Sequence, residues 1–184
     1  MEHITSTDID QTVDTVVTIG NFDGVHMGHR KLIETAKEYA EKLSLKLVVL
    51  TFNPHPMFVF GDRKNAALIM SPEEKCITME KMGVDTYIEY PFDREFASMS
   101  PEDFAIKLLF ERLRSKVVVV GYDYHFGSKQ KGDDKLLEKL GKEYGVKTVF
   151  IPKVIYEGSR VSSTRIRECI LNLSLIHISE PTRQ

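Results

Sequence analysis

Two histidines that lie three residues apart, His26 and His29, follow an apolar run and stand among three glycines. The segment from Gly20 to His29 reads GNFDGVHMGH, and an amphipathic helical pattern follows it directly. Glycines let the backbone turn sharply and let a ligand approach without an intervening Cβ. The first turn of a helix offers unpaired N–H groups and the positive end of its dipole to an anion. This order of strand, glycines, histidines and helix therefore predicts a phosphate site.

Two other interpretations of the histidine pair stay open. Histidines at this spacing can ligate a metal, but a third ligand with zinc-like spacing is missing, since His55 and His125 belong to other predicted loops. The pair could also be purely structural. The segment matches neither a Walker loop, which requires GKS or GKT, nor the dinucleotide pattern GxGxxG.

Three further polar clusters follow predicted strands. TFNPHP ends at Pro56 and supplies Asn53 and His55 in a loop that two prolines stiffen. GYDYHFG, residues 121–127, combines aromatic rings with an acid and suits a ring or nucleobase ligand. RVSSTRIR, residues 160–167, places hydroxyls among three arginines at a helix start, which predicts a second anion site suited to polyphosphate. A rigid turn, core aromatics and helix caps are the respective structural alternatives.

The sequence shows no nucleophile paired with a base and no Ser/His/Asp arrangement. Two anion sites without a covalent nucleophile favour direct transfer between phosphates. Such a reaction is catalysed by positioning and by neutralisation of charge.

The elements that must position these clusters alternate between strand and helix patterns. Apolar runs rich in β-branched residues predict five strands, at Thr15–Ile19, Leu45–Phe52, Thr86–Tyr90, Lys116–Val120 and Lys147–Ile151. Helical patterns lie between and after them, at His29–Leu43, from Ser71, from Ser100, at Asp133–Tyr144, and from Ser162 or Ser163. We therefore expect an α/β fold, a three-layer sandwich with a mainly parallel five-stranded sheet, and ligands at the carboxyl ends of its strands.

Composition excludes several classes of protein. The chain has 184 residues, of which 42% are hydrophobic and 28% charged, so it can bury a core and is not wholly disordered. A formal charge of -2 argues against a dedicated nucleic-acid binder, and no apolar run approaches the ~20 residues of a membrane span. The start lacks a signal-peptide pattern, and Cys76 and Cys169 form no CxxC, so we expect free thiols and a cytoplasmic location.

Taken together, the four clusters resemble one branch of the nucleotidylyltransferase superfamily, whose signature is HxGH. GNFDGVHMGH, TFNPHP, GYDYHFG with its trailing KGD, and SSTRIR resemble the FMN adenylyltransferase module of bacterial bifunctional riboflavin kinase/FAD synthetases. The resemblance runs from about Val16 to Ile170. It implies a Rossmann-like fold and the reaction of FMN with ATP to give FAD and pyrophosphate, with Mg²⁺.

The resemblance also implies roles for individual residues. His26 and His29 would hold the ATP phosphates and stabilise charge on the leaving pyrophosphate, while Asn53 and Asp123 would position the reacting phosphates, the metal or FMN. Asp123 stands where many members carry Asn. The adenylate pocket would be shaped by Gly20, Phe22, Asp23, Gly24 and Gly28. Polyphosphate would be bound by Arg160, Ser163, Thr164 and Arg167, and the flavin by Asn53, Pro54, His55, Tyr122 and Tyr124.

We expect residues 1–170 to form the adenylyltransferase domain and residues 171–184, LNLSLIHISEPTRQ, to be a candidate non-native tail. The riboflavin kinase domain that follows this module in the family is absent from the sequence, so we expect no kinase activity. Two other functions stay open: a nucleotide- or flavin-binding module without turnover, and an adenylyl- or cytidylyltransferase acting on another phosphate ester. The sequence does not specify the metal ligands or the oligomeric state.

Overall fold

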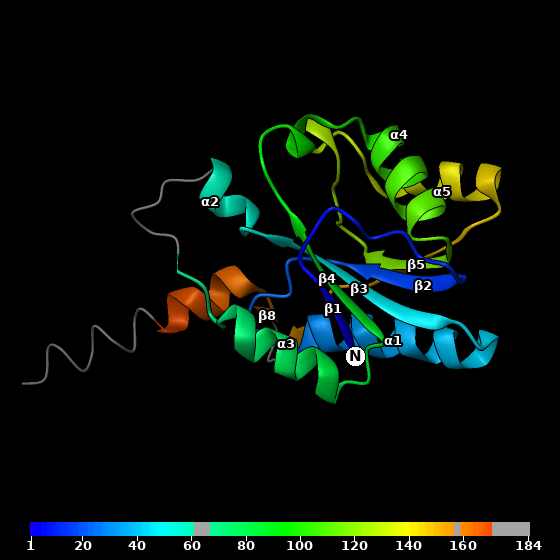
Figure 1. Ribbon diagram of the computed structural model, residues 1–184. Helices are drawn as coiled ribbons and strands as arrows, with labels where there is room; N and C mark the ends of the chain where they lie inside the picture. The colour runs from blue at the N-terminus through cyan, green and yellow to red at the C-terminus, as the bar shows by residue number, and fades with distance from the viewer. Residues whose placement is uncertain (61–66, 157–158, 171–184) are drawn as a thin grey trace, which may run out of the picture.

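A sheet of six parallel strands forms the centre of the computed structural model, in the order β1-β4-β3-β2-β5-β6 (Figure 1). The model describes residues 1–60, 67–156 and 159–170, with the backbone alone at 159 and 160. The strands are β1 (Glu2–Ile4), β2 (Thr15–Ile19), β3 (Lys46–Asn53), β4 (Thr86–Pro91), β5 (Ser115–Gly121) and β6 (Lys147–Ile151). The predicted α/β class and parallel sheet are confirmed, but the predicted number of strands is wrong, because β1 adds a sixth at the edge.

Helices cover both faces of the sheet and make the three layers. On one face lie α1 (Met27–Leu43) and α3 (Pro72–Lys81); on the other lie α4 (Pro101–Asp103), its π-helical continuation η3 (Phe104–Arg112), and α5 (Asp134–Tyr144) (Figure 1). Neighbouring residues of a strand point to opposite faces. Val16 of β2 therefore packs in the same core as Ile33 of α1, whereas Val17 packs with Leu108 of η3. Burial on both faces explains the continuous hydrophobicity of the central strands.

Local signals fix where the helices begin and end. Ser71 and Glu74 form a capping box at the start of α3, and Asp133 accepts a hydrogen bond from the backbone of the first turn of α5. Helix α5 ends at Tyr144 and is capped by Gly145, whose φ of 70° is the left-handed conformation that favours glycine. The predicted starts at Ser71 and Ser100 are confirmed, since Ser100 caps α4.

Several short elements complete the chain. They are α2 (Pro56–Phe60), η2 (Phe96–Ser98), η4 (Ser128–Gln130), the antiparallel pair β7 (Ile155–Tyr156) and β8 (Ser159–Arg160), and a final helix over 163–170. The loop expected at the prolines of TFNPHP is thus partly helical, because Pro56 occupies the first position of α2, where a missing N–H costs nothing. The tail predicted at 171–184 lies outside the described residues.

The order of the strands defines one crevice at the carboxyl edge of the sheet. After β2 the chain adds β3 and β4 on one side, then returns to add β5 and β6 on the other side of β2. The connections that leave β2 and β5 therefore diverge at a topological switch point. Ligands of open α/β sheets bind at this point.

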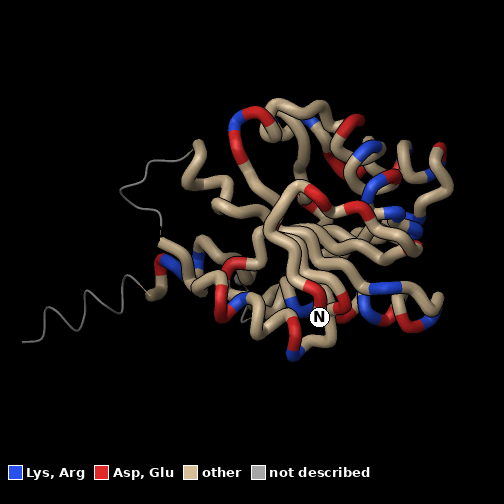
Figure 2. Tube along the Cα trace, viewed as in Figure 1, with Lys and Arg blue, Asp and Glu red and all other residues tan. Residues whose placement is uncertain are grey.

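Charged residues of both signs are spread over the helices and peripheral loops, whereas the sheet is nearly free of them (Figure 2). Three charged side chains depart from this pattern, because Asp23 in the loop after β2, Lys75 of α3 and Glu89 of β4 are buried. Within the described ranges, no helix is both long enough and apolar enough to cross a membrane.

Candidate active site

The loop that connects β2 to α1 has an unusual backbone. Phe22 and Val25 have positive φ angles of 48° and 35°, which non-glycine residues rarely adopt. Between them, Gly24 has a φ of 79°, and a Cβ there would lie 2.9 Å from Cγ2 of Ile69. Such a conformation persists only where surrounding contacts hold it, and strained loops of this kind concentrate at functional sites.

The predicted histidine pair lies at the start of α1 as two stacked rings. The ring centroids of His26 and His29 are 3.6 Å apart with an interplanar angle of 15°, and Phe22 meets His29 edge-on at 5.3 Å. His26 caps the helix, since its Nδ1 accepts a hydrogen bond from the backbone N–H of His29 at 3.4 Å. The stacking fixes both imidazoles at the positive end of the helix dipole.

His29 is neutral at physiological pH and has a free polar atom. Burial lowers its pKa to about 3, and the neighbouring His26 and the cation of Lys75 lower it further in smaller amounts. Its Nδ1 is buried and has no hydrogen-bond partner among the described residues. A buried polar atom without a partner is costly in the free protein.

Asp23 is completely buried and is the point where several distant segments meet. One carboxylate oxygen accepts hydrogen bonds from the backbone N–H groups of Ile69 and Met70, at 2.9 and 3.3 Å. The other lies 2.6 Å from Nη2 of Arg167, in the helix over 163–170. The hydroxyl of Ser163 donates to the backbone carbonyl of Asp23 at 2.9 Å. The SSTRIR segment is thereby fastened to the loop that carries the histidines.

This arrangement brings Ser163 and Arg167, two of the four residues predicted to bind polyphosphate, to the loop that carries the histidines. Arg167 faces the loop through Asp23 and also donates from Nε to the carbonyl of Ala67 at 2.9 Å. Thr164 is exposed in the first turn of the same helix, and the side chain of Arg160 lies outside the described residues. A direct contact of these residues with polyphosphate remains a prediction.

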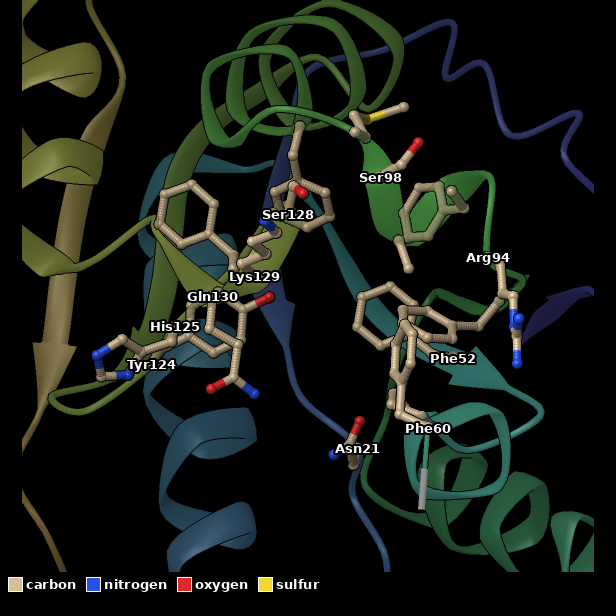
Figure 3. Close-up of a pocket in the computed structure, with 18 of the residues that line it drawn as sticks. Asn21, Phe52, Phe60, Arg94, Ser98, Tyr124, His125, Ser128, Lys129 and Gln130 are labelled. Atoms are coloured by element: carbon tan, nitrogen blue, oxygen red, sulfur yellow. The ribbon is translucent and has the colours of Figure 1, made fainter. Parts of the chain in front are cut away.

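A cavity of about 750 Å³ opens beside the loop, between two groups of aromatic rings (Figure 3). Gly20 and Asn21, at the start of the loop, are among the residues that line it. Tyr124 and Phe126, after β5, stack on one another with centroids 5.8 Å apart. The aromatic residues of the other group are Phe52, Phe60, Phe92, Phe96 and Phe104.

The second group of rings forms a continuous wall. Phe92 contacts Phe52 at 5.4 Å, Phe96 at 5.7 Å and Phe60 at 5.9 Å between centroids, mostly edge to face. Phe60 is 65% exposed although it lines the cavity, which is unusual for a large apolar side chain. Apolar walls of this kind with few polar groups are typical of sites for planar ring ligands.

The predicted flavin-binding residues are distributed unevenly around this cavity. Tyr124 lines it, and burial raises the pKa of the Tyr124 phenol. Tyr122 is 61% exposed, and its side chain does not line the cavity. Asn53 ends β3 and Pro54 follows it, and neither lines the cavity; Nδ1 of His55 accepts a hydrogen bond from the backbone of α2.

The charges at the rim of the cavity include a carboxylate and two cations. Asp123 lines the cavity and lies 3.4 Å from Nζ of Lys153. Arg94 and Lys129 line it from the other loops. Half-buried His55 stays neutral, since its partial burial lowers its pKa to about 4 and the nearby Asp23 only partly opposes that effect.

Sequence reasoning missed the aromatic wall and its cations. Phe92 and Phe96 lie between the strand predicted to end at Tyr90 and the helix predicted from Ser100, and Phe104 lies in that helix. The available signal was their density immediately after β4, because β4 ends at the same edge of the sheet as β2 and β3.

Comparisons with known proteins agree with the motifs. The FAD synthetase family model matches residues 8–165. A bifunctional riboflavin kinase/FMN adenylyltransferase of Escherichia coli (strain K12) is 38% identical over 160 residues, covering 87% of this chain and 51% of the relative. Its counterpart in Bacillus subtilis (strain 168) is 34% identical over 165 residues, covering 89% and 51%.

A solved structure shares the fold as well. The crystal structure of a Streptococcus pneumoniae protein titled macrolide-efflux protein superposes with a TM-score of 0.79 at 33% identity, covering 92% of this chain and 57% of that one. The chain spans about half the length of the curated relatives it matches. The family match extends over most of the described residues and confirms the resemblance inferred from the four motifs. The chain belongs to the FAD synthetase family.

Proposed function

We propose that this chain transfers AMP from ATP to FMN, giving FAD and pyrophosphate. One observation carries the proposal beyond family membership: the aromatic cavity and the histidine-bearing loop share Gly20 and Asn21. A planar ring in the cavity would therefore extend its phosphate towards the loop at the start of α1. The relatives that the chain matches are named for riboflavin kinase and FMN adenylyltransferase activities.

The reaction needs no covalent intermediate. An oxygen of the FMN phosphate attacks the α-phosphorus of ATP, the bond from that phosphorus to the bridging oxygen of the β-phosphate breaks, and pyrophosphate leaves. Both partners are phosphates, so the protein needs to align them in line and offset their charge. The loop after β2 and the helix over 163–170, joined through Asp23, are suited to this alignment.

The histidine pair would act as hydrogen-bond donors to the phosphates. His29 is neutral before substrate binds, because burial lowers its pKa to about 3. Phosphate charge nearby favours the protonated form, so binding of ATP would raise this pKa. Stronger donation as charge builds on the leaving pyrophosphate would stabilise the transition state more than the bound substrate.

Mg²⁺ fits this site as the partner of the ATP phosphates. Protein sites for Mg²⁺ commonly supply one or two carboxylates and leave the remaining ligands to phosphate and water. Asp123, which lines the cavity beside the ammonium of Lys153, is the carboxylate that would hold the ion. The ion would neutralise phosphate charge. The described residues contain no group of three or more His, Cys, Asp or Glu side chains able to hold a metal ion.

The direct test is to incubate the purified chain with FMN, ATP and Mg²⁺ and to separate the flavins by chromatography. FAD and pyrophosphate should form in equal amounts. Omission of FMN should abolish pyrophosphate release. Binding of ATP without pyrophosphate release, with FMN and with other phosphate esters as acceptors, would contradict the proposal and favour a binding module.

A further inference from the structure

Lys75, in the first half of α3, is only 5% exposed. Lysine is almost never buried this deeply without a paired charge. No carboxylate lies within salt-bridge distance of its Nζ in the described part of the chain, although Asp23 and Glu89 are near enough to favour its charged form. Burial lowers the pKa of Lys75, which shows that this position disfavours a cation.

The contact that Lys75 does make is with the phosphate loop. Its Nζ donates to the backbone carbonyl of Asn21 at 3.3 Å. The hydroxyl of buried Thr51, on β3, donates to the same carbonyl at 3.1 Å. The carbonyl is thus held from two elements, directly before Phe22, the first residue of the loop with a positive φ.

The neighbouring carboxylates do not depend on Lys75 for partners. Asp23 pairs with Arg167 at 2.6 Å, and Glu89 lies 2.9 Å from Nε2 of His3. Removing the Lys75 ammonium would therefore leave each carboxylate with its own cationic or hydrogen-bonding partner. A straight-chain apolar residue of similar length would suit the buried position, and replacing buried charge in this way is often neutral or stabilising.

We propose that Lys75 is a positioning residue for adenylyl transfer: its buried ammonium holds the carbonyl of Asn21, and with it the strained loop that places His26 and His29. The inference rests on the proposed function. Lys75 would lower the stability of the fold while holding the loop in its active position, which is a common trade-off between stability and activity in enzymes. The positive charge of Lys75 also influences His29 directly, because it lowers the pKa of that imidazole and so favours its neutral form.

The test compares three substitutions on one helix. Lys75→Met removes the donor and keeps the length of the side chain, and Lys75→Arg keeps the charge and the donors. Lys81→Met is the matched control, since Lys81 is exposed in the last turn of α3. The measurements are kcat and KM for ATP and FMN, the melting temperature, and the imidazole Cε1–H resonances of His26 and His29.

Lys75→Met should lower kcat by about tenfold to a hundredfold, the scale for slight misplacement of reacting groups, and should change the KM values less. Its melting temperature should stay equal to or exceed that of the wild type. The resonances of the stacked imidazoles should shift, since each ring shields the other. Lys75→Arg should recover part of kcat, and Lys81→Met should match the wild type throughout.

A kcat within twofold of the wild type in Lys75→Met, or unmoved imidazole resonances, would overturn the proposal. So would a fall in melting temperature of many degrees with normal kcat for the folded fraction, because that result assigns Lys75 to stability alone. The resonances require no turnover. They test the position of the loop separately if the wild-type chain forms no FAD.

Discussion

His29 has two features that are unfavourable in the free protein. Its imidazole is held neutral by burial, with a pKa of about 3, while its Nδ1 is buried without a hydrogen-bond partner among the described residues. A phosphate that binds nearby favours protonation of the ring and so opposes the effect of burial on its pKa. The ring is therefore better matched to the substrate-bound state than to the free protein.

We expect His29→Ala to reduce kcat by roughly 10²-fold or more, because that is the scale for removing one preorganised donor to developing charge. KM for ATP should change much less. Steady-state rates of FAD formation provide the measurement. A variant with a nearly normal kcat and only a raised KM would show that His29 contributes to ground-state binding instead.

At the scale of elements, the sequence predicted the parts of the fold whose signals are local. Strands β2 to β6 are short runs rich in β-branched and aromatic residues, and Ser71 and Ser100 start their helices as capping patterns predict. β1 could not be predicted in this way, because Glu2–Ile4 has no apolar pattern and becomes a strand only by pairing with β4.

The candidate site also has parts that local sequence signals predict and parts that depend on packing between distant segments. The four motifs at strand ends follow from the chain itself, and the structure gathers His26, His29, Asp23 and Arg167 at one loop. The role of Phe92 and of Lys75 depends on packing between segments, and no local pattern distinguishes a cavity wall from a core or a buried lysine from a solvated one.

The link between the loop after β2 and the helix over 163–170 predicts a double-mutant cycle. Arg167→Met should lower the free energy of unfolding by about 3 kcal/mol or more, because it leaves the buried Asp23 carboxylate without its cation. Asp23→Asn combined with Arg167→Met should recover much of this loss. Urea unfolding measures both variants.

Arg165→Met is the control for this cycle, since Arg165 is exposed on the same helix. Its unfolding free energy should stay within about 0.5 kcal/mol of the wild type. If the losses from Asp23→Asn and Arg167→Met simply add, the two side chains are not coupled in solution.

The aromatic wall predicts that Phe60 contributes to flavin binding. Phe60→Ala should weaken FMN binding about fivefold to tenfold, on the order of 1 kcal/mol for one aromatic contact, without lowering the melting temperature, because the side chain is largely exposed. Quenching of FMN fluorescence measures the affinity. Tyr122→Ala tests the alternative that the flavin binds at Tyr122 of the GYDYHFG motif, since Tyr122 does not line the cavity. A larger effect at Tyr122 than at Phe60 would move the flavin out of this cavity.

At the scale of the whole molecule, two neutral histidines make stability depend on pH. The pKa values of His29 and His55 are lowered to about 3 and about 4, below the 6.5 of the unfolded chain. Between these values and 6.5 the unfolded state binds more protons, so stability falls as pH decreases below 6.5.

Each histidine should contribute a loss on the order of 1 kcal/mol per pH unit across this window. Urea unfolding at pH 7 and pH 5 should show the loss in the wild type. It should be reduced in His29→Gln and reduced again when His55→Gln is added. A wild-type stability that is the same at both pH values would contradict the burial of the two rings.

The contact between Asp23 and Arg167 joins residues 144 positions apart and also sets an order of events during synthesis. A chain emerging from the ribosome folds from its N-terminal end, so the loop after β2 is made long before its cation. Until residue 167 has been translated, the Asp23 carboxylate lacks the partner that fixes it in the interior. We expect nascent chains shorter than this to form much of the sheet without retaining nucleotide, so that competence for substrate is acquired only with the helix over 163–170.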